Sequence, residues 1–178
     1  GFKQAAAAFG CETVFSGTPD YDITKQIASF EQDMVKSPAG ILVHPMQADP
    51  FIEPINRAID SNIQVSTFAA DSPNSNRASY ITSDNLAEAK FAADEIVKQI
   101  GDSAEYAVLE NPGQSNHDLR VTALLSYMEE NYPNMKLVGR QATNQDSNAA
   151  YRATASIVQA NPNLGAIWIP EAGSAEGA

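Results

Sequence analysis

Short β-prone runs and segments of helical periodicity alternate along nearly all of this chain of 178 residues. Residues 39–45 and 63–68 have the composition of buried strands, and Pro45 closes the first of them. Apolar residues recur every three or four positions over 23–34 and 52–59, which is typical of helices with one buried face. Strands separated by helices pair in parallel, so the pattern predicts an α/β fold with parallel sheets and helices on both faces.

The same alternation resumes after Ser83-Asp84-Asn85, which has the composition of a helix N-cap, and the helix that follows ends at Gly101. A long helix is expected from about Ser115 to Asn131. Further strands are expected at 106–109, 136–141 and 165–169. We therefore divide the chain into a first lobe, residues 1–84, and a second lobe, residues 85–178.

The first residues of the chain also fit this pattern. Phe2, Ala6 and Phe9 lie at helical spacing before Gly10, and we expect this helix to cover a sheet. Thr13 to Phe15 is a β-prone run, and we expect a short strand there. Since the pattern opens inside a helix, our expectation is that these residues form a portion of a longer protein.

Composition and charge exclude several classes of function. The formal net charge is −11, and an acidic surface repels phosphate backbones and anionic membranes, so no nucleic-acid partner is expected. No apolar run approaches the roughly 20 residues of a membrane-spanning helix, so direct membrane insertion is not expected. The single cysteine, Cys11, cannot form an internal disulfide or a cysteine-based zinc site.

The loops that follow the strands are the places to look for a site. Right-handed crossovers bring the carboxyl ends of parallel strands to one edge of a sheet, and ligands bind at that edge in open α/β folds. The loops in question are 44–50, 69–77, 110–117, 142–148 and 170–174.

One of these loops carries a pattern related to a catalytic motif. Gly113-Gln114-Ser115-Asn116-His117 matches the nucleophile elbow G-x-S-x-G except at its last position, where a glycine is needed for tight packing. Alternatively, Ser115 caps the following helix, with Asp118 completing a capping box, and we favour this interpretation. Glu110 and Glu171 both follow strands and leave a glycosidase open as an alternative.

Cofactor chemistry has little support in the sequence. Neither a dinucleotide-binding G-x-G-x-x-G nor a phosphate-binding G-x-x-x-x-G-K-[ST] pattern is present. A metal site would have to combine His44 and His117 from separate loops, without the local spacing of known zinc motifs. We expect no cofactor and no bound metal.

Two strand-end or helix-start residues are candidates for binding a ligand. Arg120, in the first turns of its helix, can donate several fixed hydrogen bonds to a sugar or carboxylate, or it can pair with surface acids. His44 either contacts a ligand or is a structural residue with its hydrogen bonds satisfied. The residues alone leave both alternatives open.

The order of the segments 41–51, 63–68, 71–77 and 80–85 resembles the type I periplasmic sugar-binding proteins. These are the ribose-binding-like receptors of ABC importers, which are related to the effector cores of LacI-type repressors. The resemblance covers essentially the whole chain and is most specific over residues 63–85. The segment Pro170-x-Ala172 resembles the corresponding segment in the branch of this family that binds deoxysugars and a furanosyl signalling molecule.

The resemblance implies a two-lobed binder that closes on a small sugar or polyol by hinge motion. It also implies an ABC-transporter permease as partner and a periplasmic or lipid-anchored extracellular location. Carried over residue by residue, the ligand-binding positions are His44, Asp71, Arg120, Gln145 and Glu171. Asp146, beside Gln145, would help to form one wall of the site.

The chain also departs from the family pattern. Relatives usually carry an aspartate where this chain has Ala69, so Asp71 would have to substitute for it. The family's first strand and the rest of its second lobe have no counterpart here, and we expect a fold truncated at both ends.

Three classes of function remain, and we rank an extracytoplasmic solute receptor, not an enzyme, first. The alternative is the ligand-sensing module of a repressor or sensor kinase. A hydrolase on a similar sheet ranks last. The acidic charge favours the receptor over a DNA-binding repressor.

Overall fold

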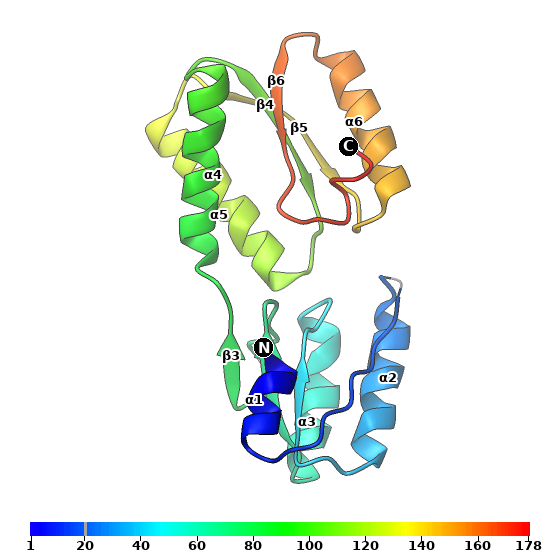
Figure 1. Cartoon of the computed structure of the whole chain (residues 1–178). Coiled ribbons are helices and arrows are strands. Elements are labelled where there is room, and N and C mark those ends of the chain that lie inside the picture. The colour runs from blue at the N-terminus through cyan, green and yellow to red at the C-terminus, as the bar shows by residue number, and fades with distance from the viewer. Residues whose placement is uncertain (20) are drawn as a thin grey trace.

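Two separate three-stranded parallel sheets form the framework of the molecule (Figure 1). The computed structural model describes residues 1–19 and 21–178. The first sheet has the order β1 (Gly40–Val43), β2 (Gln64–Phe68), β3 (Ser79–Ile81). The second has the order β5 (Lys136–Ala142), β4 (Glu105–Glu110), β6 (Leu164–Trp168). We call the parts built on these sheets the first and second lobes. The dividing line between residues 84 and 85 remains our proposal.

The helices fill the intervals between the strands, as expected of crossover connections. In the first lobe they are α1 (Phe2–Ala8), α2 (Ile23–Val35), the short 3₁₀ helix η1 (Asp49–Phe51) and α3 (Ile52–Asp60). In the second lobe they are α4 (Asn85–Ile100), α5 (Ser115–Asn131) and α6 (Ser147–Ala160).

In the first lobe, β1 and β2 are neighbouring parallel strands, with Ile41 opposite Val65, which confirms the predicted pairing. Helices α2 and α3 pack together over this sheet, and Phe30 meets Phe51 edge to face at 5.8 Å between ring centroids. Val65, on the central strand of the three, is fully buried beneath them. The apolar stripes of the two helices therefore form one core with the sheet.

In the second lobe, the side chains of β4 alternate between two cores. Tyr106 and Val108 belong to the cluster under α4 and α5, whereas Ala107 and Leu109 belong to the cluster under α6. Figure 1 shows α4 and α5 on one side of this sheet and α6 on the other. This central strand is buried on both faces, which is why its sequence is an almost continuous apolar run.

Two expectations for the N-terminal region are wrong. Residues 13–15 form no strand, and Val14 and Phe15 are 72% and 88% exposed. A strand needs a neighbour for its backbone groups, and a β-prone composition does not supply one. Helix α1 forms as predicted. None of its residues is buried, however, so the expectation that this helix covers a sheet is wrong.

The chain passes from the first sheet to the second lobe through the short segment between β3 and α4 (Figure 1). Asp84 ends this segment as the N-cap of α4, where its carboxylate accepts hydrogen bonds from the backbone N–H of Leu86 and Ala87. Among the residues described, no helix is long and apolar enough to span a bilayer.

Candidate ligand-binding cleft

The two lobes meet at the carboxyl ends of their strands, where the loops after β1, β2 and β4 contact one another. The backbone N–H of Ala48 donates to the carbonyl of Gly113 at 3.3 Å. The backbone N–H of Asp71 donates to Ser115 Oγ at 2.7 Å. The edge identified from the sequence is thus the place where the lobes face each other.

Gln114, which precedes α5, lies at the centre of this contact. Its amide oxygen accepts from Asn111 Nδ2 at 2.9 Å and from Gln145 Nε2 at 2.8 Å. Its amide nitrogen lies 3.1 Å from Asn116 Oδ1. Although it is a long polar residue, Gln114 is only 2% exposed, and a polar group buried this deeply is stable only when hydrogen-bonded.

Both histidines of the chain also face the Gln114 amide nitrogen. His44 Nε2, at the end of β1 in the first lobe, lies 3.4 Å from it, and His117 Nε2, in the first turn of α5, lies 3.2 Å from it. Burial lowers the pKa of His44 below its ordinary value. Burial, with the charges of Arg120 and His44, lowers the pKa of His117 to about 4. Both rings are therefore neutral at pH 7.

Within residues 1–19 and 21–178, two buried polar atoms of this cluster have no hydrogen-bond partner. They are Asn111 Oδ1, in the loop after β4, and His117 Nδ1. An unpaired polar atom away from water costs about 1–3 kcal/mol. The cluster thus has unused capacity to accept and donate hydrogen bonds.

Asp71 lies at the lobe contact, but its carboxylate is turned into the first lobe. Both of its oxygens are engaged by Arg77, and Thr67 Oγ1 donates to Oδ1 at 2.6 Å. Burial alone would raise the pKa of Asp71, but the hydrogen bonds from Arg77 and Thr67 outweigh it and hold the pKa below its ordinary value. The negative charge of Asp71 is thus balanced by Arg77, a partner that was not predicted from the sequence.

Arg120 connects three elements of the second lobe. Its Nε donates to Asn85 Oδ1 at 2.9 Å and lies 2.8 Å from Glu88 Oε2, both on α4. Its Nη1 donates to the carbonyl of Pro170, in the loop after β6, at 2.9 Å. Arg120 therefore has both of the roles considered from the sequence: it pairs with an acid, and it reaches a strand-end loop.

Gln145 and Glu171 belong to adjacent loops of the second lobe. Gln145 reaches Gln114, as described, from a left-handed backbone conformation with φ 58°. Both carboxylate oxygens of Glu171 accept from the backbone N–H of Ser174, at 3.0 and 3.1 Å. Asp146 is the N-cap of α6 and accepts from Ala149 N at 2.6 Å. Gln145 thus lines the contact, while Asp146 organises a helix start.

The five residues carried over from the family are brought together only in part. His44 and Gln145 both contact Gln114, and Arg120 binds the residue that precedes Glu171. Their role in binding a ligand stays a prediction. Sequence reasoning missed the central position of Gln114 and the involvement of Asn111. The available signal was that both lie in a flagged loop directly after a buried strand.

The predicted cap at Ser115 is wrong. The N-cap of α5 is Gln114, without a side-chain hydrogen bond, and Ser115 is the first helical residue. Instead, Asp118 folds back to accept from the backbone N–H of Gly113 at 3.1 and 3.3 Å. The Ser115 hydroxyl accepts from the backbone N–H of Asp71 in the opposite lobe.

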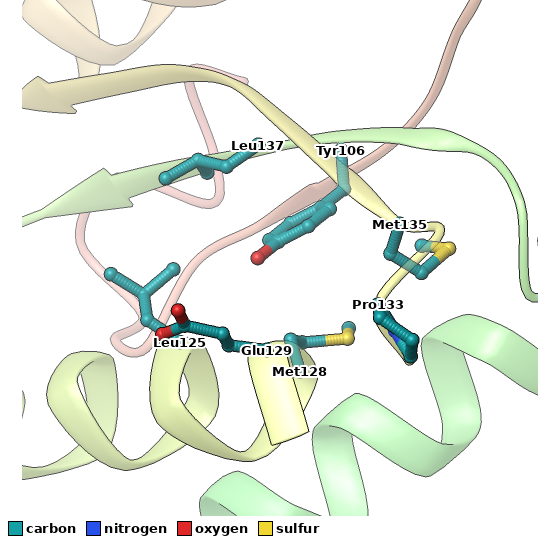
Figure 2. A pocket seen from close by; sticks show the side chains of 7 residues that line it. All are labelled: Tyr106, Leu125, Met128, Glu129, Pro133, Met135 and Leu137. Atoms are coloured by element: carbon teal, nitrogen blue, oxygen red, sulfur yellow. The ribbon is translucent and has the colours of Figure 1, made fainter. Parts of the chain in front are cut away.

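Two cavities lie next to the cores. One, of about 460 Å³, runs beside β1 under the segment 12–17 and is also lined by His44 and Phe68. The other, of about 300 Å³, lies between the end of α5 and the start of β4 and β5, so it opens at the opposite edge of the sheet. Figure 2 shows Tyr106 and Leu137 facing Leu125 and Met128 across this second cavity. None of the predicted site residues lines it.

Neutral hydrogen-bonding groups predominate at the lobe contact. Amides and imidazoles dominate it, and the nearby ions Asp71 and Arg120 are paired with Arg77 and Glu88. Within residues 1–19 and 21–178, no group of three or more histidine, cysteine or acidic side chains could hold a metal ion. Such a surface can bind hydroxyl groups through paired donors and acceptors.

The sequence matches the family described as "Periplasmic binding protein domain" over residues 1–178. The chain therefore belongs to this family, which confirms the resemblance seen in the sequence.

Among curated proteins, the chain is 25% identical over 166 residues to the "D-apiose import binding protein" of Actinobacillus succinogenes. That match covers 92% of this chain and 53% of the relative. The "D-allose-binding periplasmic protein" of Escherichia coli is 24% identical, with 94% and 57% covered. The chain thus spans about half the length of the curated relatives it matches.

Among solved structures, a solute-binding protein from Agrobacterium vitis bound with α-D-tagatopyranose superposes with a TM-score of 0.92. It is 26% identical, with 98% of this chain and 62% of that chain covered. A sugar-binding protein of a sugar ABC transporter from Bacillus halodurans gives a TM-score of 0.87 at 28% identity, with 99% and 60% covered. These comparisons confirm the two-lobed fold, and the relatives that they name are binding proteins rather than enzymes.

Proposed function

We propose that this chain is the ligand-capturing part of an extracytoplasmic receptor that holds a small sugar or polyol between its lobes and delivers it to an ABC-transporter permease. The observation that carries the proposal is the buried polar cluster around Gln114, to which both lobes contribute and in which two atoms lack partners. A hydroxyl group both donates and accepts, so a polyol can satisfy such atoms. The names of the relatives support sugars as the ligand class.

We further propose that His44, Gln145, Arg120 and Glu171 border the ligand, with Asp71 contributing through its backbone. Because Asp71 and Arg120 are already neutralised, the proposal favours an uncharged ligand over a sugar acid. A ligand wedged between the lobes would replace the direct contact of Gln114 with His44. The Gln114 amide and the His44 ring, which contact each other without a ligand, would then both bind the ligand.

A thermal-shift screen of the chain at pH 8 tests this function. A panel of neutral pentoses, hexoses and polyols is compared with sugar acids and sugar phosphates, since a ligand of the folded state raises the melting temperature. We expect a rise with at least one neutral sugar. Replacement of Gln114 by Ala should abolish that rise, whereas Tyr151→Ala, at an exposed position of α6, should leave it unchanged. Stabilisation by charged sugars alone would contradict the proposal.

A further inference from the structure

His44 reaches Gln114 from the first lobe, and His117 contacts the same amide from within the second lobe. We call these three residues the bridge; their hydrogen bonds form in one protonation state only. The amide nitrogen of Gln114 carries two donor hydrogens and no lone pair available to accept. His44 Nε2 and His117 Nε2 lie 3.4 and 3.2 Å from it. Each ring nitrogen can therefore bind this amide only by accepting, which requires a neutral ring that carries its proton on Nδ1. Asn116 Oδ1, 3.1 Å away, shares the same two hydrogens.

The neighbouring amides fix the orientation of Gln114. If its amide turned over, its oxygen would face the histidines and could accept from protonated rings. Its nitrogen would then face Asn111 Nδ2 and Gln145 Nε2, which now donate to its oxygen at 2.9 and 2.8 Å. Its oxygen would also face Asn116 Oδ1. Four amides, those of Gln114, Asn111, Gln145 and Asn116, would have to reverse together, so the bridge resists adapting to a charged imidazole.

We propose that the contact of His44 with Gln114 is a proton-sensitive latch between the lobes, with His117 acting on it through the same amide. The latch holds the lobes together when both imidazoles are neutral, and it releases them when His44 takes up a proton or when a protonated His117 displaces Gln114. That the latch regulates ligand capture rests on the proposed function. That it regulates closure of the lobes rests only on the contact between His44 and Gln114. Asn111 and Gln145 act here as positioning residues.

The groups around the two rings give the direction of the effect. Arg120 of α5 and His44 act on His117 electrostatically, and both disfavour a second positive charge. His44 is affected mainly by burial. Asp118, also on α5, is turned to Gly113 and faces Glu110 and Arg140, while Tyr21, ahead of α2, donates to the Met46 carbonyl.

The closed state therefore binds fewer protons than the open state, in which the rings meet water. Closure is favoured above the ordinary histidine pKa of about 6.5 and weakens as the pH falls toward the value of about 4 of His117. If opening fully exposes that ring, its titration shifts the ratio of open to closed lobes by at most about tenfold at pH 5.5.

The test measures the distance between the lobes without any sugar. Spin labels are placed on cysteines introduced at Val35 in α2 and Tyr151 in α6, which are 84% and 67% exposed, in a Cys11→Ala background. Distances from electron–electron double resonance are recorded from pH 8 to pH 4.5, with circular dichroism confirming that the fold persists. The population at longer distance should rise as the pH falls below about 6.5.

The matched control replaces both histidines by glutamine, which keeps an acceptor near the Nε2 position but does not titrate. The distances in this variant should not respond to pH, and each single variant should respond less than the parent. A parent distance that stays constant, or an equal response in the histidine-free variant, would overturn the latch. Since no sugar is present, that result would leave the receptor function standing, and a failed sugar screen at pH 8 would leave the latch standing.

Discussion

The ion pair of Asp71 and Arg77 shows how one missed residue changes the meaning of a predicted one. The sequence offered Asp71 as a ligand contact, but its side chain is 9% exposed and both its oxygens are held by Arg77. The pair fixes the loop whose backbone N–H reaches Ser115 in the other lobe. Asp71 thus shapes the cleft through its backbone while its charge is used inside the first lobe.

We predict that Arg77→Ala destabilises the protein by about 3 kcal/mol in urea unfolding at pH 7, because it leaves a buried carboxylate unpaired. Arg57→Ala is the matched control. Arg57 pairs with Glu31, and their side chains are 51% and 46% exposed. An ion pair as exposed as this contributes about 0.5 kcal/mol to the free energy of unfolding. Equal losses in the two variants would show that solvent screens both pairs alike.

The cost of Arg77→Ala should also depend on pH. The pKa of Asp71 is lowered in the folded protein, so the pair contributes its stability above the unfolded value of about 3.8 and loses it as the pH falls through the folded value. In the variant Arg77 no longer offsets the burial of Asp71, so this carboxylate takes up its proton at a higher pH than in the parent. The difference between parent and variant should therefore be largest at pH 7 and shrink as the pH falls, first as Asp71 of the variant is protonated. A difference that stays constant from about pH 7 to about pH 3 would assign the effect to another group.

At the scale of secondary structure, two loops of the second lobe are packed back to back. Thr143 Oγ1 and Ser174 Oγ are 2.6 Å apart and buried. A Cβ atom on Gly173 would lie 2.9 Å from the carbonyl oxygen of Gln145, closer than a side-chain carbon normally approaches backbone. The loop after β6 therefore supports the loop that presents Gln145 to Gln114.

We predict that Gly173→Ala costs about 1–3 kcal/mol in urea unfolding, because the backbone of one loop must move. It should also weaken binding of any sugar found in the screen, measured by calorimetry, since Gln145 moves with its loop. Ala172→Ser adds one atom at the exposed neighbouring position and should change stability by less than about 0.5 kcal/mol. Equal effects of the two changes would contradict the close packing.

Local patterns predicted most elements because each buried segment carries its own signal. The helix from Ser115 to Asn131 and the pairing of β1 with β2 follow from periodicity and apolar runs. The failures depend on distant partners. Residues 13–15 have no strand to pair with among those described, and the Ser115 hydroxyl accepts from a residue 44 positions away.

The site was predictable to the extent that a parallel fold brings strand ends together. His44 was found in this way. The pairing of Asp71 with Arg77 and the meeting of five side chains at Gln114 depend on loop conformations, such as the left-handed backbone of Gln145, that no local sequence signal specifies.

For the molecule as a whole, the important contrast is between its apolar cores and its polar lobe contact. Each sheet has its own core, and the hydrogen bonds that cross between lobes involve backbone, hydroxyl, amide and imidazole groups. Polar contacts of this kind couple two bodies only weakly, because water can replace them.

We predict that the lobes unfold as separate cooperative units. In scanning calorimetry the calorimetric enthalpy should exceed the van't Hoff enthalpy. Arg77→Ala should lower the melting temperature of the first-lobe component and leave the other in place. A single transition with equal enthalpies, shifted as a whole by Arg77→Ala, would show that the lobes melt as one body.

The separation of the cores bears on how the proposed receptor could change its ligand over evolutionary time. Each lobe presents one wall of the proposed site from a scaffold whose packing does not involve the other. Recombination between genes at the segment joining β3 to α4 can therefore exchange one wall without rebuilding a core. Grafting a second lobe from a relative onto this first lobe would keep His44 while replacing Gln114 and Gln145, and new specificities would arise from whole walls rather than single residues.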